Sequence, residues 1–144
     1  MSSPSPTSPD LTGGCGCGAV RYAISEPLVS AAYCHCTRCQ RRTGTAAAAS
    51  ALIAPGSLTV LSGADVLGRW SPGGGGFVKV FCGTCGSAVF IEHPDTGEVR
   101  GVRLGTFDGD PGIRPQLRQH VASAAVWEPI PDDGLPRFDA RRPG

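Results

Sequence analysis

The cysteines are the residues of this chain whose type and spacing most clearly predict chemistry. Seven are present, as a C-x-C pair, a C-x-C-x-x-C triplet and a C-x-x-C pair. In chain order they are Cys15 and Cys17, then Cys34, Cys36 and Cys39, and then Cys82 and Cys85. An odd number of cysteines, after an opening segment unlike a signal peptide, argues against a secreted disulfide framework. Closely spaced thiols instead indicate ligands for a metal ion, with zinc the default and iron a weaker alternative.

The two cysteine pairs have a glycine beside every cysteine, in GGCGCG (13–18) and FCGTCGS (81–87). Glycine permits tight turns and positive φ angles that direct backbone N–H groups at a metal-bound sulfur. Four thiolates from two such turns fill a tetrahedral shell and leave no position for a substrate. We therefore predict one structural zinc on Cys15, Cys17, Cys82 and Cys85, which ties the N-terminal region to the middle of the chain.

The triplet, in YCHCTRCQRRTG (33–44), has no glycine between its cysteines and is predicted to run from an extended segment into a helix. Because side chains alternate along an extended segment, Cys34 and Cys36 are expected on one side and His35 on the other. Cys39, in the first helical turn, is expected on the same side as Cys34 and Cys36. Three thiolates leave one position of a tetrahedral ion open, which is typical of a catalytic zinc. Because three anionic sulfurs weaken the Lewis acidity of the ion, this site favours binding of a thiol over activation of water.

Side chains around the triplet have two interpretations each. Arg38, Arg41 and Arg42 share a helix face and could receive the carboxylates of a bound ligand. Alternatively, they form a solvated face near the C-terminus of the helix, where its dipole favours positive charge. His35 could act on the site from the second shell, as a hydrogen-bond donor to sulfur or a proton shuttle, or could make a structural hydrogen bond.

The many glycines and prolines, 21 and 13 in 144 residues, divide the chain into short segments and predict a mainly β fold. Alternating or apolar patterns predict strands at 18–25, 77–81, 87–91, 98–104 and 120–127. One short helix is expected from Thr37, its N-cap, to about Arg42, with Gly44 as the stop. The Ala-rich run 45–54 is left undecided between helix and strand.

Other features receive structural interpretations. The glycine tract Gly73–Gly76 predicts a flexible hairpin connection rather than a phosphate loop, because no Lys-Ser/Thr follows it and it enters a strand. His93 and His120, remote from the cysteines in sequence, are interpreted as structural. The aromatic and aliphatic residues expected in the core are Phe81, Phe90, Leu104 and Trp127, the last covering the metal region.

Composition limits the classes of partner. With 17% charged residues and a formal net charge of +1, the chain has no broad electrostatic footprint for nucleic acid or for an anionic membrane. No apolar stretch approaches the 18 or so residues of a membrane span, so a cytoplasmic protein is predicted. We expect one domain at 12–138, between flexible tails at 1–11 and 139–144. The oligomeric state is left open, a homodimer included.

Four motifs together resemble the glutathione-dependent formaldehyde-activating enzyme family, also named with centromere protein V. They are GGCGCGAVRY, YCHCTRCQRRTG, FCGTCGS and WEPIPDDGLPRF (127–138), so the resemblance runs from about Gly13 to Phe138. It implies a β-tent of small antiparallel sheets organised around zinc, with the run 45–54 as a strand. Carried over by residue, it also implies a structural zinc on the four paired cysteines and a catalytic zinc on the triplet.

The resemblance implies a function as well. The family's namesake reaction adds glutathione, a co-substrate, to formaldehyde to form S-hydroxymethylglutathione, which is a carbon–sulfur lyase reaction written in reverse. The partners expected are therefore a small thiol and an aldehyde. The alternative is a non-catalytic, zinc-stabilised binding module, since centromere protein V is associated with chromosomes and microtubules. This chain lacks the basic tail that such a role would favour.

Overall fold

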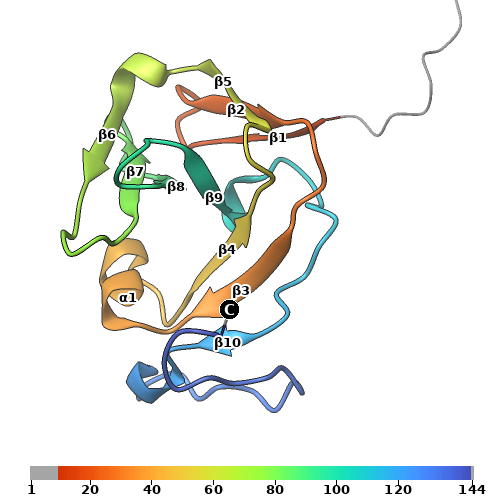
Figure 1. Cartoon of the computed structure of the whole chain (residues 1–144), viewed down its shortest axis with the longest axis vertical. Coiled ribbons are helices and arrows are strands. Elements are labelled where there is room, and N and C mark those ends of the chain that lie inside the picture. Colours follow the sequence, from red (N-terminus) through yellow and green to blue (C-terminus); the bar gives the residue numbers. More distant parts are fainter. Residues whose placement is uncertain (1–9, 144) are drawn as a thin grey trace, which may run out of the picture.

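Two β-sheets form the framework of the computed structural model, which describes residues 10–143 (Figure 1). The smaller sheet is antiparallel, in the order β1 (Leu11–Gly14), β2 (Arg21–Ile24) and β5 (Leu58–Ser62). The larger sheet has the order β10 (Arg118–Gln119), β3 (Ser30–Cys34), β4 (Ala48–Leu52), β9 (Val99–Arg103), β8 (Ala88–Glu92), β7 (Val78–Cys82) and β6 (Leu67–Trp70). Its neighbours are antiparallel except β10 and β3, which are parallel. The predicted mainly β class is confirmed, although one sheet has seven strands.

The core lies between β2 and one face of the larger sheet. Val80, Phe90, Val102 and Ala51 are paired in register across β7, β8, β9 and β4, and all are buried. From β2, Tyr22 packs against this row, with its ring centroid 5.4 Å from that of Phe90 in an edge-on arrangement. Since successive residues of a strand point to opposite faces, the neighbouring row lies on the other face of the sheet.

The predicted helix is confirmed as α1 (Thr37–Thr43), but its cap differs from the prediction. Cys36, not Thr37, is the N-cap: it has extended φ and ψ of −65° and 152°, and its sulfur accepts a hydrogen bond from the Cys39 N–H at 3.3 Å. The Cys36 sulfur thus caps the helix in place of the Thr37 hydroxyl. Gly44 ends the helix in the left-handed conformation, at φ 68°, as predicted.

Strands confirm most of the predicted β segments. The segments 18–25 and 98–104 contain β2 and β9, the segments 77–81 and 87–91 overlap all but the last residue of β7 and β8, and the undecided run 45–54 contains β4. The segment 120–127 was wrongly predicted. His120 has a φ of 57° and is followed by a 3-10 turn, Val121–Ser123, whose N–H groups bond outside any sheet. The apolar pattern there faces solvent, with Trp127 65% exposed, so the prediction of Trp127 as a core residue was also wrong.

The predictions for the other core residues and for the glycine tract are confirmed in part. Phe90 is buried as predicted, whereas Phe81 and Leu104 are half-buried. The glycine tract connects β6 and β7, which pair as an antiparallel hairpin, so the hairpin prediction is confirmed. Two further 3-10 turns, Ala64–Val66 and Leu104–Thr106, precede β6 and follow β9. Among the described residues, no helix has the length and apolar character needed to cross a membrane.

Both predicted tails make contacts in the part that is described. Residues 1–9 lie outside the described residues, but Leu11 opens β1 and pairs with Ile24. At the other end, the carbonyl of Ala140 accepts a hydrogen bond from the His120 N–H, and the N–H of Arg142 donates to the side chain of Gln119. Contacts of the described residues therefore include Leu11, Ala140 and Arg142, which lie on either side of the predicted domain 12–138.

Candidate metal centres

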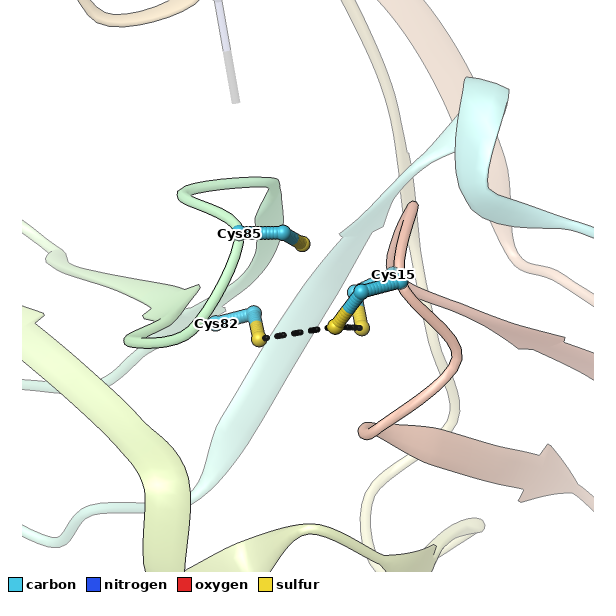
Figure 2. Close-up of side chains that lie close together, drawn as sticks. Cys15, Cys82 and Cys85 are labelled. Carbon is cyan, nitrogen blue, oxygen red and sulfur yellow. Dashed lines mark hydrogen bonds between the residues drawn. The ribbon is translucent and has the colours of Figure 1, made fainter.

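Four cysteines from two distant parts of the chain meet at one point. The sulfurs of Cys15, Cys17, Cys82 and Cys85 all lie within 4.8 Å of one another, and Figure 2 shows those of Cys15, Cys82 and Cys85 directed toward each other. The Cys15–Cys17 and Cys17–Cys82 sulfur distances are 3.7 and 3.9 Å. A tetrahedral zinc with Zn–S bonds of about 2.3 Å needs sulfurs about 3.8 Å apart. The four-cysteine cluster therefore fits a zinc ion.

Two glycine turns shape this cluster. Gly18 and Gly86 each follow the second cysteine of a pair, with φ angles of 81° and 82° that favour glycine. Each donates its N–H to the carbonyl of the first cysteine, at 3.2 Å to Cys15 and 2.7 Å to Cys82. The Val20 N–H then points at the Cys15 sulfur, 3.2 Å away. This is the backbone geometry that glycine beside each cysteine predicted.

Ser87, which the sequence analysis did not single out, links the two turns. Its hydroxyl oxygen accepts a hydrogen bond from the Gly16 N–H at 2.9 Å and lies 3.1 Å from the Cys85 sulfur. The hydrogen bond from Ser87 is the main cause that lowers the pKa of Cys85, to about 5. A thiolate is thereby favoured at a position that needs one. The only signal in the sequence is the serine two residues after the second pair, in CGTCGS.

The triplet forms a second cluster. Cys34 is the last residue of β3, Cys36 caps α1, Cys39 lies in its first turn, and their sulfurs are within 4.8 Å of one another. Hydrogen bonding from the Cys34 thiol, with smaller contributions from Cys36 and from nearby cations, lowers the pKa of Cys39 to about 5 although burial opposes this. The pKa of Cys34 is raised correspondingly. Three sulfurs converge as predicted, and they can hold one metal ion with a position to spare.

A cavity of about 460 Å³ opens beside the triplet. Its floor is the face of the larger sheet opposite the core, where Lys79, Ile91 and Leu52 lie in the row next to the buried one. Cys34, Cys36 and Cys39 line the same cavity, as do Gly75 and Gly76 of the β6–β7 connection. The four-cysteine cluster contributes no residue to it. The two clusters therefore differ, because the triplet lines this ligand-sized cavity and the four-cysteine cluster does not.

Basic side chains gather around this cavity. Six of the 13 lysines and arginines line it, and no acidic residue is among the lining residues that the structure describes. They are Arg38, Lys79, Arg100, Arg103, Arg141 and Arg142. Such a surface favours an anionic ligand, and a carboxylate or thiolate would be held by several charge-assisted contacts.

The positive charges of Lys79 and Arg103 act on the triplet, where both help to lower the pKa of Cys39. Lys79 is buried, and its burial followed by the charge of Arg103 lowers its pKa. Arg103 donates to the Ser50 hydroxyl at 2.8 Å, while its Nε is buried with no hydrogen-bond partner among the described residues. Buried donors and cations are costly unless a partner satisfies them. Their signal in the sequence is a basic residue inside an apolar strand, in FVKVF and VRGVR.

Of the other side chains predicted to act on the triplet, which are Arg38, Arg41, Arg42 and His35, one lines the cavity. Arg38 lines the cavity, but Arg41 and Arg42 do not, and Arg42 instead lies over the Phe81 ring at 5.3 Å. His35 faces away from the triplet into a second cavity. Its Nε2 lies 3.2 Å from the Arg118 guanidinium, which can only donate, so His35 makes the structural hydrogen bond that was its alternative interpretation.

The two histidines interpreted as structural, His93 and His120, have different surroundings. The Nδ1 of His93 accepts a hydrogen bond from the Asp95 N–H at 3.1 Å, as a structural side chain would. His120 lines the cavity beside the triplet. It is also the one non-glycine residue in the described range with a positive φ, a backbone strain that clusters at functional sites. The strictly structural interpretation of His120 is therefore incomplete.

Comparison with known proteins agrees with the site. The family model of the glutathione-dependent formaldehyde-activating enzyme matches residues 10–123, which include all seven cysteines. The chain belongs to this family. Among solved structures, it is similar to a Rhodobacter sphaeroides protein determined as a Northeast Structural Genomics target. The two are 28% identical over 88% of this chain and 98% of that chain, with a TM-score of 0.55. None of the curated proteins compared with the chain matches it.

Membership in the glutathione-dependent formaldehyde-activating enzyme family confirms the resemblance drawn from the cysteine motifs. The family match ends at residue 123, directly after His120 and the 3-10 turn. Arg141 and Arg142, which line the cavity, therefore come from a part of the chain beyond the matched residues.

Proposed function

We propose that this family member is a zinc-dependent enzyme of the carbon–sulfur lyase type, which joins a small thiol such as glutathione to an aldehyde such as formaldehyde. The observation that carries the proposal is the three-cysteine cluster beside a cavity of about 460 Å³. A structural site would need a fourth protein ligand and no cavity. The reaction named by the family supports the same class.

The proposed reaction is an addition and needs no oxidant or reductant. The thiol sulfur bonds to the carbonyl carbon, the π electron pair of the C=O bond moves to oxygen, and the proton of the thiol ends on that oxygen. Zinc held by the triplet would supply an open position that binds the incoming sulfur as a thiolate at neutral pH. The product is S-hydroxymethylglutathione when the thiol is glutathione and the aldehyde is formaldehyde.

The residues of the cavity would position the reactants and the proton. Lys79 and Arg103 place positive charge beside Cys39, where they favour thiolate over thiol. The imidazole of His120 is suited to take the proton released by the thiol and to return it to the carbonyl oxygen, since an imidazole nitrogen can both accept and donate a proton. Arg38 is the member of the predicted arginine face that remains available to a carboxylate of the thiol.

Cobalt-substituted protein tests the proposal without relying on turnover. Addition of glutathione should change the visible spectrum, because a fourth sulfur enters the coordination shell. S-methylglutathione, which cannot ionise at sulfur, should bind far more weakly, and Cys36→Ser should abolish the spectral response. If no thiol alters the spectrum, or if S-methylglutathione binds as well as glutathione, the binding-module alternative replaces the proposal.

A further inference from the structure

The chain beyond the family match returns to the edge of the larger sheet. We define residues 136–143 as the C-terminal segment, drawn in blue beside β10 and β3 in Figure 1. The Arg118 N–H donates to the Pro136 carbonyl and the Phe138 N–H donates to the Arg118 carbonyl, each at 2.9 Å. Two residues further along both segments, the His120 N–H donates to the Ala140 carbonyl at 2.9 Å. The segment is therefore held along β10 by its backbone.

This attachment brings the C-terminal segment close to the triplet. Gln119 of β10 is the register partner of Cys34 on β3. The Arg142 N–H donates to the Gln119 side chain at 3.2 Å, and the Arg142 guanidinium donates to the Ser30 hydroxyl at 3.3 Å. Adjacent strands are about 4.8 Å apart, so a short series of neighbours connects Arg142 to a candidate metal ligand.

The two arginines of this segment face an unbalanced charge environment. Arg141 and Arg142 line the cavity together with four other basic side chains. Neither has a carboxylate partner within salt-bridge distance among the described residues. By contrast, Arg114 forms an ion pair with Asp110, and Arg118 forms one with Asp133. Donors without an anion at the rim of a cavity favour an anionic group on the ligand.

We propose that Arg142, with Arg141 beside it, binds a carboxylate of the thiol substrate, so that the C-terminal segment determines which thiols the site accepts. This inference rests on the proposed function and deepens it. A thiol whose sulfur lies at the triplet and whose carboxylate lies at Arg142 would span the cavity, whose volume is within the usual range for small-ligand sites, about 300–1,000 Å³. A neutral thiol would gain nothing from the segment.

Titration calorimetry on the full-length, zinc-loaded protein tests the inference. The double variant Arg141→Gln, Arg142→Gln keeps the backbone contact of residue 142 to Gln119 but removes both charges. It should bind glutathione about tenfold more weakly, the loss typical of one charge-assisted hydrogen bond. Binding of glutathione diethyl ester, which has the same sulfur and no free carboxylate, should change less than twofold. Arg114→Gln is the control, because Arg114 is exposed, bonded to Asp110 and outside the cavity.

The outcomes separate the inference from the proposed function. If the wild-type protein binds glutathione and the double variant binds it equally well, the specificity role of the segment is overturned while the proposed function stands. Equal weakening for glutathione and for its diethyl ester would indicate a general disturbance of the site and would also overturn it. If the wild-type protein binds neither thiol, the proposed function is lost and the inference with it.

Discussion

At the scale of single residues, Cys82 and Cys36 have the same side chain in different surroundings. Cys82 has no exposed surface and belongs to the core cluster with Val80 and Val89. Cys36 is half-buried, caps α1 with its sulfur and lines the cavity. Loss of the Cys82 thiol removes a metal-binding group from the core, whereas loss of the Cys36 thiol removes one that lines the cavity. We expect metal binding to contribute to folding only in the first case.

We therefore expect Cys82→Ser to lower the free energy of unfolding by at least about 3 kcal/mol, which corresponds to a fall in Tm of about 6–12 °C. Cys36→Ser should lower it by less than about 1 kcal/mol, since serine is itself a good N-cap. Thermal melts of the two variants followed by circular dichroism measure the difference. Equal melting temperatures, or the reverse order, would show that the cysteines are assigned to the wrong sites.

At the scale of elements, Tyr22 connects the two sheets. It comes from β2, packs edge-on against Phe90 of β8 and Phe107, and its hydroxyl lies 2.7 Å from the Thr106 hydroxyl after β9. The side chain is fully buried. Burial raises the pKa of Tyr22 to about 12, although the hydrogen bond with Thr106 lowers it. The contact between the sheets thus depends on a neutral phenol.

This pKa predicts a loss of stability in alkali. The unfolded pKa is about 10, so the contribution of the neutral phenol is complete below pH 10 and is lost as the pH rises toward 12. Between pH 9 and pH 11 the wild-type protein should lose about 1 kcal/mol more than Tyr22→Phe, which cannot ionise. Urea unfolding at the two pH values gives both free energies. Parallel losses in the two proteins would contradict a buried, ionisable Tyr22 at this contact.

At the scale of the whole molecule, charge is distributed unevenly. The chain has 13 basic and 12 acidic residues, which nearly cancel. Six of the basic residues nevertheless line one cavity, with no acidic residue beside them in the described part of the chain. Net charge therefore says little about the field that an approaching ligand meets, because a concave surface of one sign concentrates the potential.

Salt should consequently weaken the binding of anionic thiols more than that of neutral ones. Between 50 and 500 mM sodium chloride, the association rate of glutathione with the zinc-loaded protein should fall about tenfold, since the screening length shortens severalfold. The rate for 2-mercaptoethanol should change less than twofold. Stopped-flow measurements on both thiols provide the comparison. The same salt dependence for the two would argue that the six basic residues do not attract the ligand.

Features that depend only on neighbouring residues could be predicted from the amino-acid sequence. Glycines beside Cys15, Cys17, Cys82 and Cys85 specified the tight turns, and their absence from the triplet specified a strand that runs into a helix. The stop at Gly44 follows from the same local reasoning. Backbone conformation over three or four residues is set by those residues, so both candidate metal centres could be predicted.

The surroundings of the triplet depend on how distant parts of the chain pack together. Lys79, Arg103 and Arg142 are far apart in the chain, and strand register together with the return of the C-terminal segment brings them to one cavity. The same pairing turns His35 toward Arg118 and leaves His120 beside the triplet. A shift of one residue in register would move every side chain of a strand to the other face. Such contacts depend on the packing of whole strands, and no local pattern in the sequence specifies them.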